Sequence, residues 1–331
     1  MPPNKSIKIF INYFLGPLLA VWLGFSIYRQ IVQQPHLEAS WIAVKRSFSS
    51  SRVLLFAGAV LLVVANWGIE ARKWQLSVRN IHPVSFGKAF KAVLSGVSFA
   101  VSTPNRMGEY LGRMLFLPDG FRLRSISVTL VGSIGQLLIT LYAGFAALMV
   151  LKNALTATPY YSKVLYQFAL FGVGASAFFL TLFYFETGAL GRLLNKWLSK
   201  TRYRYLIESL EAFSNRLLLQ LLLLSALRYA VFVLQYLLLF RFFGVQVGLW
   251  EGTHALGMQF LTMAVIPSIA LAEVGLRGEI SLTLLGLFST NSLGIGLTTV
   301  SIWFLNLVIP AVAGTGLILS VRFFNKQNEK D

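Results

Sequence analysis

Long apolar runs alternate with short polar segments along the chain, and this pattern predicts a helical membrane protein. Runs without Asp, Glu, Lys or Arg cover 27 residues at Ser125–Leu151 and 42 residues at 280–321. A helix of roughly 20 apolar residues crosses the hydrocarbon core of a bilayer. We therefore predict an all-α polytopic protein, a single membrane domain over residues 1–331 with about six transmembrane helices. The predicted spans are Ile9–Tyr28, Val53–Ile69, Ser125–Leu151, Val164–Phe185, Leu217–Phe240 and Ile295–Val321.

Two further apolar segments are interrupted by polar residues, which predicts broken helices. In Phe86–Thr103 the uncharged run after Lys91 lasts only 14 residues, too few to span, and the polar motif 101–113 follows it. The second motif, 266–279, reads IPSIALAEVGLRGE and separates the predicted half-helices Gly252–Pro267 and Leu276–Phe288. Pro and Gly within an apolar segment are typical of a helix that enters the membrane, breaks and turns back. We therefore predict two re-entrant pairs.

Ionisable side chains at bilayer depth are the candidate functional residues. Each costs roughly 2.5–3.5 kcal/mol on insertion scales, so a group of them indicates a function or mutual pairing. Arginine suits phosphate recognition, and broken helices present free backbone N–H groups to anions. Ordinary Arg–Glu pairing is the structural alternative for each of them. The candidate substrate-binding residues are Pro104, Arg106, Gly108, Glu109, Arg113, Arg228, Glu273, Gly275, Arg277 and Glu279.

Arg228 is the twelfth residue of its predicted span and therefore lies near the bilayer midplane. We predict that Glu109, Glu273 or Glu279 pairs with it, the alternative being an arginine that extends to the headgroups. The stretch 67–74, with Trp67 and Trp74 at its ends, is interpreted as an interfacial anchor. The two motifs are expected to meet around one polar cavity near the midplane.

Composition narrows the partners. The chain is 56% hydrophobic and 12% charged, with a net charge of +17. Because its basic residues flank apolar segments, we predict a membrane phospholipid or other anionic lipid as partner and no nucleic acid. The chain has no Cys, its three His residues are scattered, and no catalytic or cofactor motif is seen, so we expect no metal, no cofactor and no enzyme activity.

The distribution of basic residues predicts the orientation. If the segment near residue 100 does not cross, 20 of the 29 Lys and Arg residues lie on the side of the termini and 7 on the other. The positive-inside rule then places both termini, including the tail 322–331, in the cytoplasm of a bacterial inner membrane. Residues 190–216 predict an amphipathic helix on that surface, or a solvated loop helix. With this topology the two re-entrant pairs have opposite orientation, as in inverted-repeat transporters.

At the two motifs the chain resembles the lysylphosphatidylglycerol synthase transmembrane-region family of flippase-like membrane proteins. Residues 103–109 look like that family's Thr-Pro-Gly-Arg-x-Gly-Glu motif, with Asn105 in place of Gly. Residues 267–279 are similar to its Pro and Gly-Gly-Leu-Gly-x-Arg-Glu motif, with Ala272-Glu273 for the Gly pair and Gly278 inserted. Larger family members add a soluble aminoacyl-transferase domain, so the resemblance implies the translocating part without lipid lysylation.

These observations lead to the expectation of flippase-like transport of a phosphate-bearing lipid. A membrane-embedded transferase acting on a lipid headgroup, with Glu109 or Glu273 as base, is the alternative from another class. A non-transporting membrane scaffold is a third. The sequence is also compatible with a homo-oligomer.

Accessibility labelling tests the predicted topology. Residues 70–91, 186–216 and the C-terminus should be labelled from the cytoplasm, and residues 152–163 from outside, because of the excess of basic residues on the first side. Labelling of 186–216 from outside would contradict the re-entrant assignment near residue 100.

Overall fold

The computed structural model describes residues 37–101, 103, 106–157, 162–187, 213–266 and 270–328, together with residues 25, 28 and 32. This described part of the chain is α-helical and contains no strand. The predicted first span Ile9–Tyr28 and the predicted surface helix at 190–216 fall almost wholly outside the described residues.

Five segments of the described chain are long and apolar enough to cross a membrane. They are α4 (Val53–Val78), α7 (Asp119–Val150), α9 (Lys163–Phe185), α12 (Asn215–Phe242) and the run Ser292–Ile318. The last run combines α15 (Ser292–Trp303), the π-helix η3 (Phe304–Val308) and the first part of α16 (Ile309–Asn328). These segments coincide with five of the predicted spans and confirm a helical protein with several membrane-span candidates.

Short polar side chains mark where several of these helices begin. Ser162 Oγ accepts a hydrogen bond from the Leu165 N–H at the start of α9, and Ser214 Oγ accepts one from Leu217 N–H at the start of α12. These bonds satisfy backbone donors that have no partner in the first turn of a helix.

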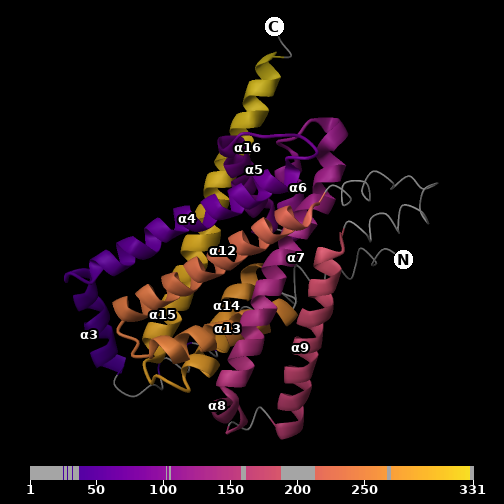
Figure 1. Ribbon diagram of the computed structural model, residues 1–331. Helices are drawn as coiled ribbons and strands as arrows, with labels where there is room; N and C mark the ends of the chain where they lie inside the picture. Colours follow the sequence, from indigo (N-terminus) through magenta and orange to yellow (C-terminus); the bar gives the residue numbers. More distant parts are fainter. Residues whose placement is uncertain are drawn as a thin grey trace, which may run out of the picture.

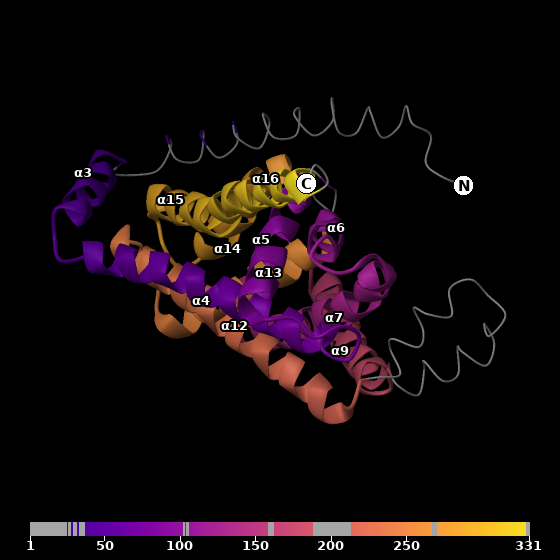
Figure 2. The ribbon, with the colours of Figure 1, turned by 90° about the horizontal axis from the view of Figure 1, so that it is seen from above.

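The long helices form one bundle with two apolar cores. Helix α4 lies along α12, and α7 packs against both α9 and α13 (Leu249–Val265), while α16 packs on α5 (Phe86–Val101) (Figures 1 and 2). One core includes Tyr236 and Phe242 of α12, and the other includes Trp74 of α4. The bundle therefore supplies rigid walls around its shorter helices.

The shorter helices form two helix–break–helix elements, as expected from the motifs. Helix α5 is followed by a break and then by α6 (Gly108–Met114); α13 is followed by a break and then by α14 (Ala270–Leu285). The expected start of the last half-helix at Leu276 was wrong. Since α14 begins six residues earlier, at Ala270, Glu273 lies within the same helix as Arg277 and not in the break before it.

One other boundary corrects the prediction, and two predicted polar segments contain helix. Helix α4 continues to Val78, so the stretch 67–74 is part of a membrane-span candidate and not an anchor beyond it. The predicted connection 29–52 contains α3 (Leu37–Phe48), and the predicted tail 322–331 is helical as far as Asn328. A further short helix, α8 (Lys152–Thr156), connects α7 towards α9. The predicted span Val53–Ile69 ended too early because Glu70 and Lys73, which follow it, are buried by ion pairing in the bundle.

The π-helix η3 has a cause in the sequence. Proline has no N–H, and its ring clashes with the carbonyl four residues before it. Pro310 therefore frees the carbonyl of Asn306, at the centre of η3, from the α-helical ladder. π-turns of this kind recur at functional sites.

Close backbone contact between α5 and α6 holds the first break in shape. A Cβ added at Gly112 would lie 2.5 Å from the Gly96 Cα, and one added at Gly108 would overlap the Phe99 carbonyl oxygen. Small residues allow helices this close approach in membranes. The Gly108 N–H also donates to Thr103 Oγ1 at 2.7 Å, which closes the turn between the two helices.

The substitution Gly112→Ala tests this packing. The added methyl group would overlap the backbone of α5, which cannot rotate away as a side chain can, so we expect a loss of about 1–3 kcal/mol in the free energy of unfolding. Denaturation of the purified protein in mixed micelles would measure it. Gly87→Ala, also in α5 but with no atom within 4 Å of the added Cβ, is the matched control and should be nearly neutral.

Candidate functional site

A buried carboxylate, Glu70 of α4, lies among three cations. Its oxygens are 2.9 Å from Lys73 Nζ, 3.0 Å from Arg113 Nη2 and 3.3 Å from Arg228 Nη1. The side chains of Glu70, Lys73 and Arg113 are all less than 10% exposed. The cations come from α4, α6 and α12, so this one carboxylate joins three helices.

The periodicity of α4 explains how Glu70 is placed. Asn66, Glu70, Lys73 and Ser77 follow one another at intervals of three or four residues, which puts them on one face of the helix. All four are buried against the bundle. Lys73 Nζ also donates to Ser225 Oγ of α12 at 3.3 Å, so the polar face of α4 is matched by polar atoms on its neighbour.

Arg228 is held in the interior of the bundle. Its Nε donates to Asn66 Oδ1 at 2.8 Å, its side chain is 14% exposed, and its guanidinium lies 5.3 Å from the centre of the Trp67 ring. The interpretation as an arginine extending to the headgroups was therefore wrong. The predicted partners Glu109, Glu273 and Glu279 were also wrong, since the carboxylate that pairs with Arg228 is Glu70.

A chain of amides continues from Arg228 to the π-helix. Asn66 Nδ2 donates to Asn306 Oδ1 at 2.9 Å, and Asn306 Nδ2 donates to Gln235 Oε1 at 3.3 Å. Gln235 Nε2 donates in turn to the Ala59 carbonyl at 2.9 Å. These bonds fix the side chain of Asn306 at the widened turn.

The first motif forms a compact ion-paired turn. Glu109 accepts from Arg106 Nε at 2.7 Å and from Arg113 Nη2 at 2.9 Å. Arg106 has a φ of 58°, in the left-handed region that a residue other than Gly rarely adopts. Backbone strain of this kind persists only where surrounding contacts hold it, and here the bond from Arg106 to Glu109 of α6 is one of those contacts.

The second motif has a pair of its own on α14. Arg277 Nη2 donates to Glu273 Oε1 at 2.6 Å, one helical turn away. Both side chains are largely buried, at 15% and 9% exposed. Glu273 is also close enough to Arg106 for electrostatic attraction, which connects the second motif to the first.

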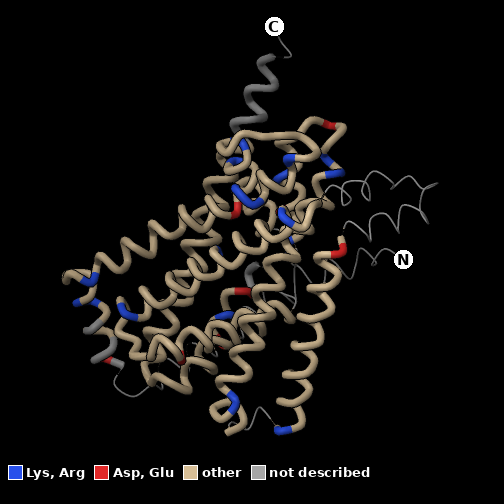
Figure 3. The backbone as a smooth tube through the Cα atoms, viewed as in Figure 1, with Lys and Arg blue, Asp and Glu red and all other residues tan. Residues whose placement is uncertain are grey.

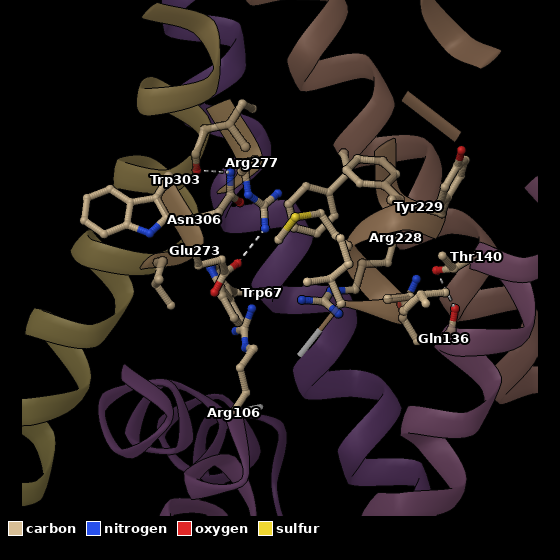
Figure 4. A pocket seen from close by; sticks show the side chains of 18 residues that line it. Trp67, Arg106, Gln136, Thr140, Arg228, Tyr229, Glu273, Arg277, Trp303 and Asn306 are labelled. Carbon is tan, nitrogen blue, oxygen red and sulfur yellow. Dashed lines mark hydrogen bonds and ion pairs between the residues drawn. The ribbon is translucent and has the colours of Figure 1, made fainter. Parts of the chain in front are cut away.

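Residues of both motifs line one cavity of about 630 Å³. Arg106 comes from the first motif, Glu273 and Arg277 from the second, and Arg228 from α12. Figure 4 shows the guanidinium groups of Arg106 and Arg277 on either side of Glu273, with Arg228 directed into the same space. Most of the other lining residues are apolar or aromatic. The aromatic ones are Trp67, Tyr229, Phe232, Phe260 and Trp303, and the uncharged polar ones are Gln136, Thr140 and Asn306.

Several predicted site residues lie outside this lining. Gly108 packs against α5, Glu109 and Arg113 belong to the ion-paired turn behind the cavity, and Gly275 and Glu279 are not among the lining residues. Pro104 lies outside the described residues. Arg106, Glu273 and Arg277 are thus the motif residues that line the cavity together.

Sequence reasoning missed Glu70, Asn66, Trp67, Trp303 and Asn306. A signal was present for three of them, because Asn66 and Glu70 repeat at helical spacing and Trp67 lies next to them in an apolar run. Asn306 gave a weaker signal as a lone amide four residues before a proline within a long apolar segment.

Polar atoms at the cavity wall have no hydrogen-bond partner among the described residues. They are the indole N–H groups of Trp67 and Trp303, the Nε–H of Arg277 and the Oε1 of Gln136. Buried polar groups nearly always have a partner, so these atoms are suited to meet a bound molecule. Across the described residues, no group of three His, Asp or Glu is arranged to hold a metal ion.

Removing the carboxylate of Glu70 tests the charged cluster. The variant Glu70→Ala leaves Lys73, Arg113 and Arg228 buried around a missing anion, and breaking a buried ion pair from one side costs about 3–5 kcal/mol. We expect that loss in the free energy of unfolding in mixed micelles. The variant Glu38→Ala removes an exposed carboxylate of α3 and should change stability little.

A double variant separates charge imbalance from lost packing. Glu70→Met with Lys73→Met removes one charge of each sign, and Arg113 keeps Glu109 while Arg228 keeps Asn66. It should be more stable than Glu70→Ala. Equal stability of Glu70→Ala and Glu38→Ala would contradict the role given to Glu70.

Comparison of the chain with protein-family models, with curated proteins and with solved structures found no match.

Proposed function

We propose that this protein moves a phosphate-bearing lipid between the leaflets of a bacterial inner membrane. The observation that supports the proposal is the shared cavity, whose wall carries Arg106, Arg228 and Arg277 from three separate elements. Arginine matches the geometry of phosphate oxygens and stays charged in a buried site. A site with three arginines inside a bundle of membrane-span candidates suits an anion that arrives from the bilayer.

The mixed character of the wall supports a lipid over a small soluble anion. Beside the charged groups it has aromatic and aliphatic side chains, and two of these, Val265 and Ile266 at the end of α13, are exposed on the surface of the molecule. A headgroup would meet the arginines, while its acyl chains stay against apolar surface and lipid. Translocation then requires the headgroup to exchange a hydrated leaflet surface for this polar interior.

In this proposal the two helix–break–helix elements are re-entrant pairs of opposite orientation. Helices α5 and α6 would enter from the cytoplasmic side, and α13 and α14 from the other, so that the breaks meet at an inverted-repeat interface. The meeting of Arg106 with Glu273 and Arg277 at one cavity supports this arrangement.

The charge distribution supports cytoplasmic termini. Described Lys and Arg residues gather toward the end of the molecule where α5, α6 and the C-terminus lie (Figure 3). Lys73 and Arg113 pair with Glu70 and Arg106 lines the cavity, so none of the three faces the membrane surface. Without them, 17 basic residues lie on the side of the termini and 7 on the opposite side. The sign of the bias is unchanged, and the positive-inside rule gives the same orientation.

Reconstitution into proteoliposomes tests the proposal. Lipids with a fluorescent acyl chain are placed in both leaflets, and an impermeant reductant added outside bleaches those that reach the outer leaflet. Bleaching beyond the outer-leaflet half, without chemical change of the lipid, supports translocation. A modified headgroup would instead support the membrane-embedded transferase. The absence of both translocation and modification would support the scaffold.

Arg106→Gln is the sharpest variant for this assay. Arg106 lines the cavity, and Glu109 retains Arg113 as its partner when Arg106 is neutralised, so the fold should persist. We expect the translocation rate to fall at least tenfold, the loss of roughly 1.4 kcal/mol or more of headgroup binding. The measurement is the initial bleaching rate at equal protein per vesicle.

Arg122→Gln is the matched control. Both arginines are 39% exposed and pair with a carboxylate three residues away, Arg122 with Asp119, but Arg122 is not at the cavity. Its translocation rate should equal that of the unmodified protein. Equal loss in both variants would mean that general surface charge, and not the cavity, carries the effect.

A further inference from the structure

The cavity wall has more positive than negative charge. Its described lining residues include three arginines, Arg106, Arg228 and Arg277, and one carboxylate, Glu273. At their ordinary protonation states this leaves a surplus of two positive charges. Uncompensated charge inside a bilayer is costly, so a ligand that brings two negative charges is favoured over one that brings fewer.

The residues behind the wall do not change this balance. Lys73 and Arg113 are opposed by Glu70 and Glu109, two charges of each sign in direct ion pairs. The surplus of two is therefore the same when the whole ion-paired network is counted, five basic groups against Glu70, Glu109 and Glu273. The cluster behind the wall fixes the position of Arg228 without neutralising it fully, since Glu70 is shared among three cations.

The unpartnered donors at the wall also indicate a ligand with many acceptor oxygens. Three N–H groups without a partner among the described residues, those of Trp67, Trp303 and Arg277 Nε, belong to lining residues on three different elements. A phosphate monoester has three terminal oxygens, and a phosphodiester has two. The guanidinium groups of the wall have the N–H donors to occupy the extra oxygen, and the three buried N–H groups belong to the same set of lining residues.

We infer that the cavity selects a lipid whose headgroup ends in a phosphate monoester with two negative charges, in preference to a singly charged phosphodiester or a zwitterion. This inference rests on the proposed function, because it names the lipid class that the same site would carry. A phosphate monoester loses its second proton near pH 6, as phosphorylated side chains do. Selectivity should therefore depend on pH through the ligand, in the range where the arginines remain charged.

Competition binding tests the inference with lipids that differ only in the headgroup. The full-length protein in detergent micelles binds a fluorescent phosphatidate, and unlabelled dioleoyl phosphatidate, phosphatidylglycerol and phosphatidylcholine compete with it. At pH 8 we expect phosphatidate to compete at a concentration at least tenfold below that of phosphatidylglycerol, and phosphatidylcholine to compete least. At pH 5 the advantage of phosphatidate over phosphatidylglycerol should fall to threefold or less.

Variants locate the selectivity at the wall. Arg106→Gln removes one surplus charge and should reduce the preference for phosphatidate at pH 8 at least threefold, while Arg122→Gln should leave it unchanged. Glycerol 3-phosphate is the soluble probe with the same phosphate and no acyl chains. It should compete at least a hundredfold more weakly than phosphatidate, and equal competition would show a site for free phosphate and overturn the assignment to a lipid.

Failure of this inference and failure of the proposed function give different results. Equal competition by phosphatidylglycerol and phosphatidate at pH 8, with translocation observed in proteoliposomes, overturns the selectivity and leaves the function. Absence of translocation for all of these lipids overturns the function, and the inference with it. An unchanged preference in Arg106→Gln also overturns the inference, because the surplus charge would then have no part in selection.

Discussion

The attraction between Glu70 and the three cations around it is the constraint on which the rest of the bundle depends. Taking one carboxylate and three basic groups out of water is unfavourable unless their geometry is satisfied. That geometry requires α4, α6 and α12 to meet at one depth. The pairing therefore holds Arg113 of α6 and Arg228 of α12 beside the same point of α4.

The ion-paired group around Glu70 and the pair Glu273–Arg277 differ in how many helices they join. The group around Glu70 connects three helices and is nearly inaccessible, whereas the pair Glu273–Arg277 is contained within α14. A change in the position of α14 would therefore leave its own ion pair intact, while a change in the position of α6 would break the pair between Arg113 and Glu70 of α4. The first helix–break–helix element is thus tied to another helix by an ion pair, and the second is attracted to Arg106 at longer range.

Much of the fold follows from the sequence because long apolar runs have few alternatives in a bilayer. All five described membrane-span candidates were predicted, and so was each break, since Pro, Gly and charge within an apolar segment are local signals. The partners of the charges could not be predicted in the same way. Glu70 and Arg228 are 158 residues apart, and which carboxylate pairs with which arginine is decided by helix packing that no local pattern records. The extension of α4 past Ile69 was missed for the same reason, because Glu70 and Lys73 are tolerable in a span only once Arg113 and Arg228 are in place.

The spacing of Glu70 and Lys73 has a consequence for biosynthesis. Arg228 leaves the ribosome 158 residues after Glu70, about 8–30 s later at ordinary rates of elongation. During that interval α4, a membrane-span candidate, is without one of its eventual partners. Because Lys73 lies one helical turn from Glu70, 2.9 Å away, the two charges neutralise each other within the nascent helix. The insertion machinery thus receives a helix in which Lys73 is already the counterion of Glu70. Arg113 and Arg228 pair with the same carboxylate after the later helices have been made.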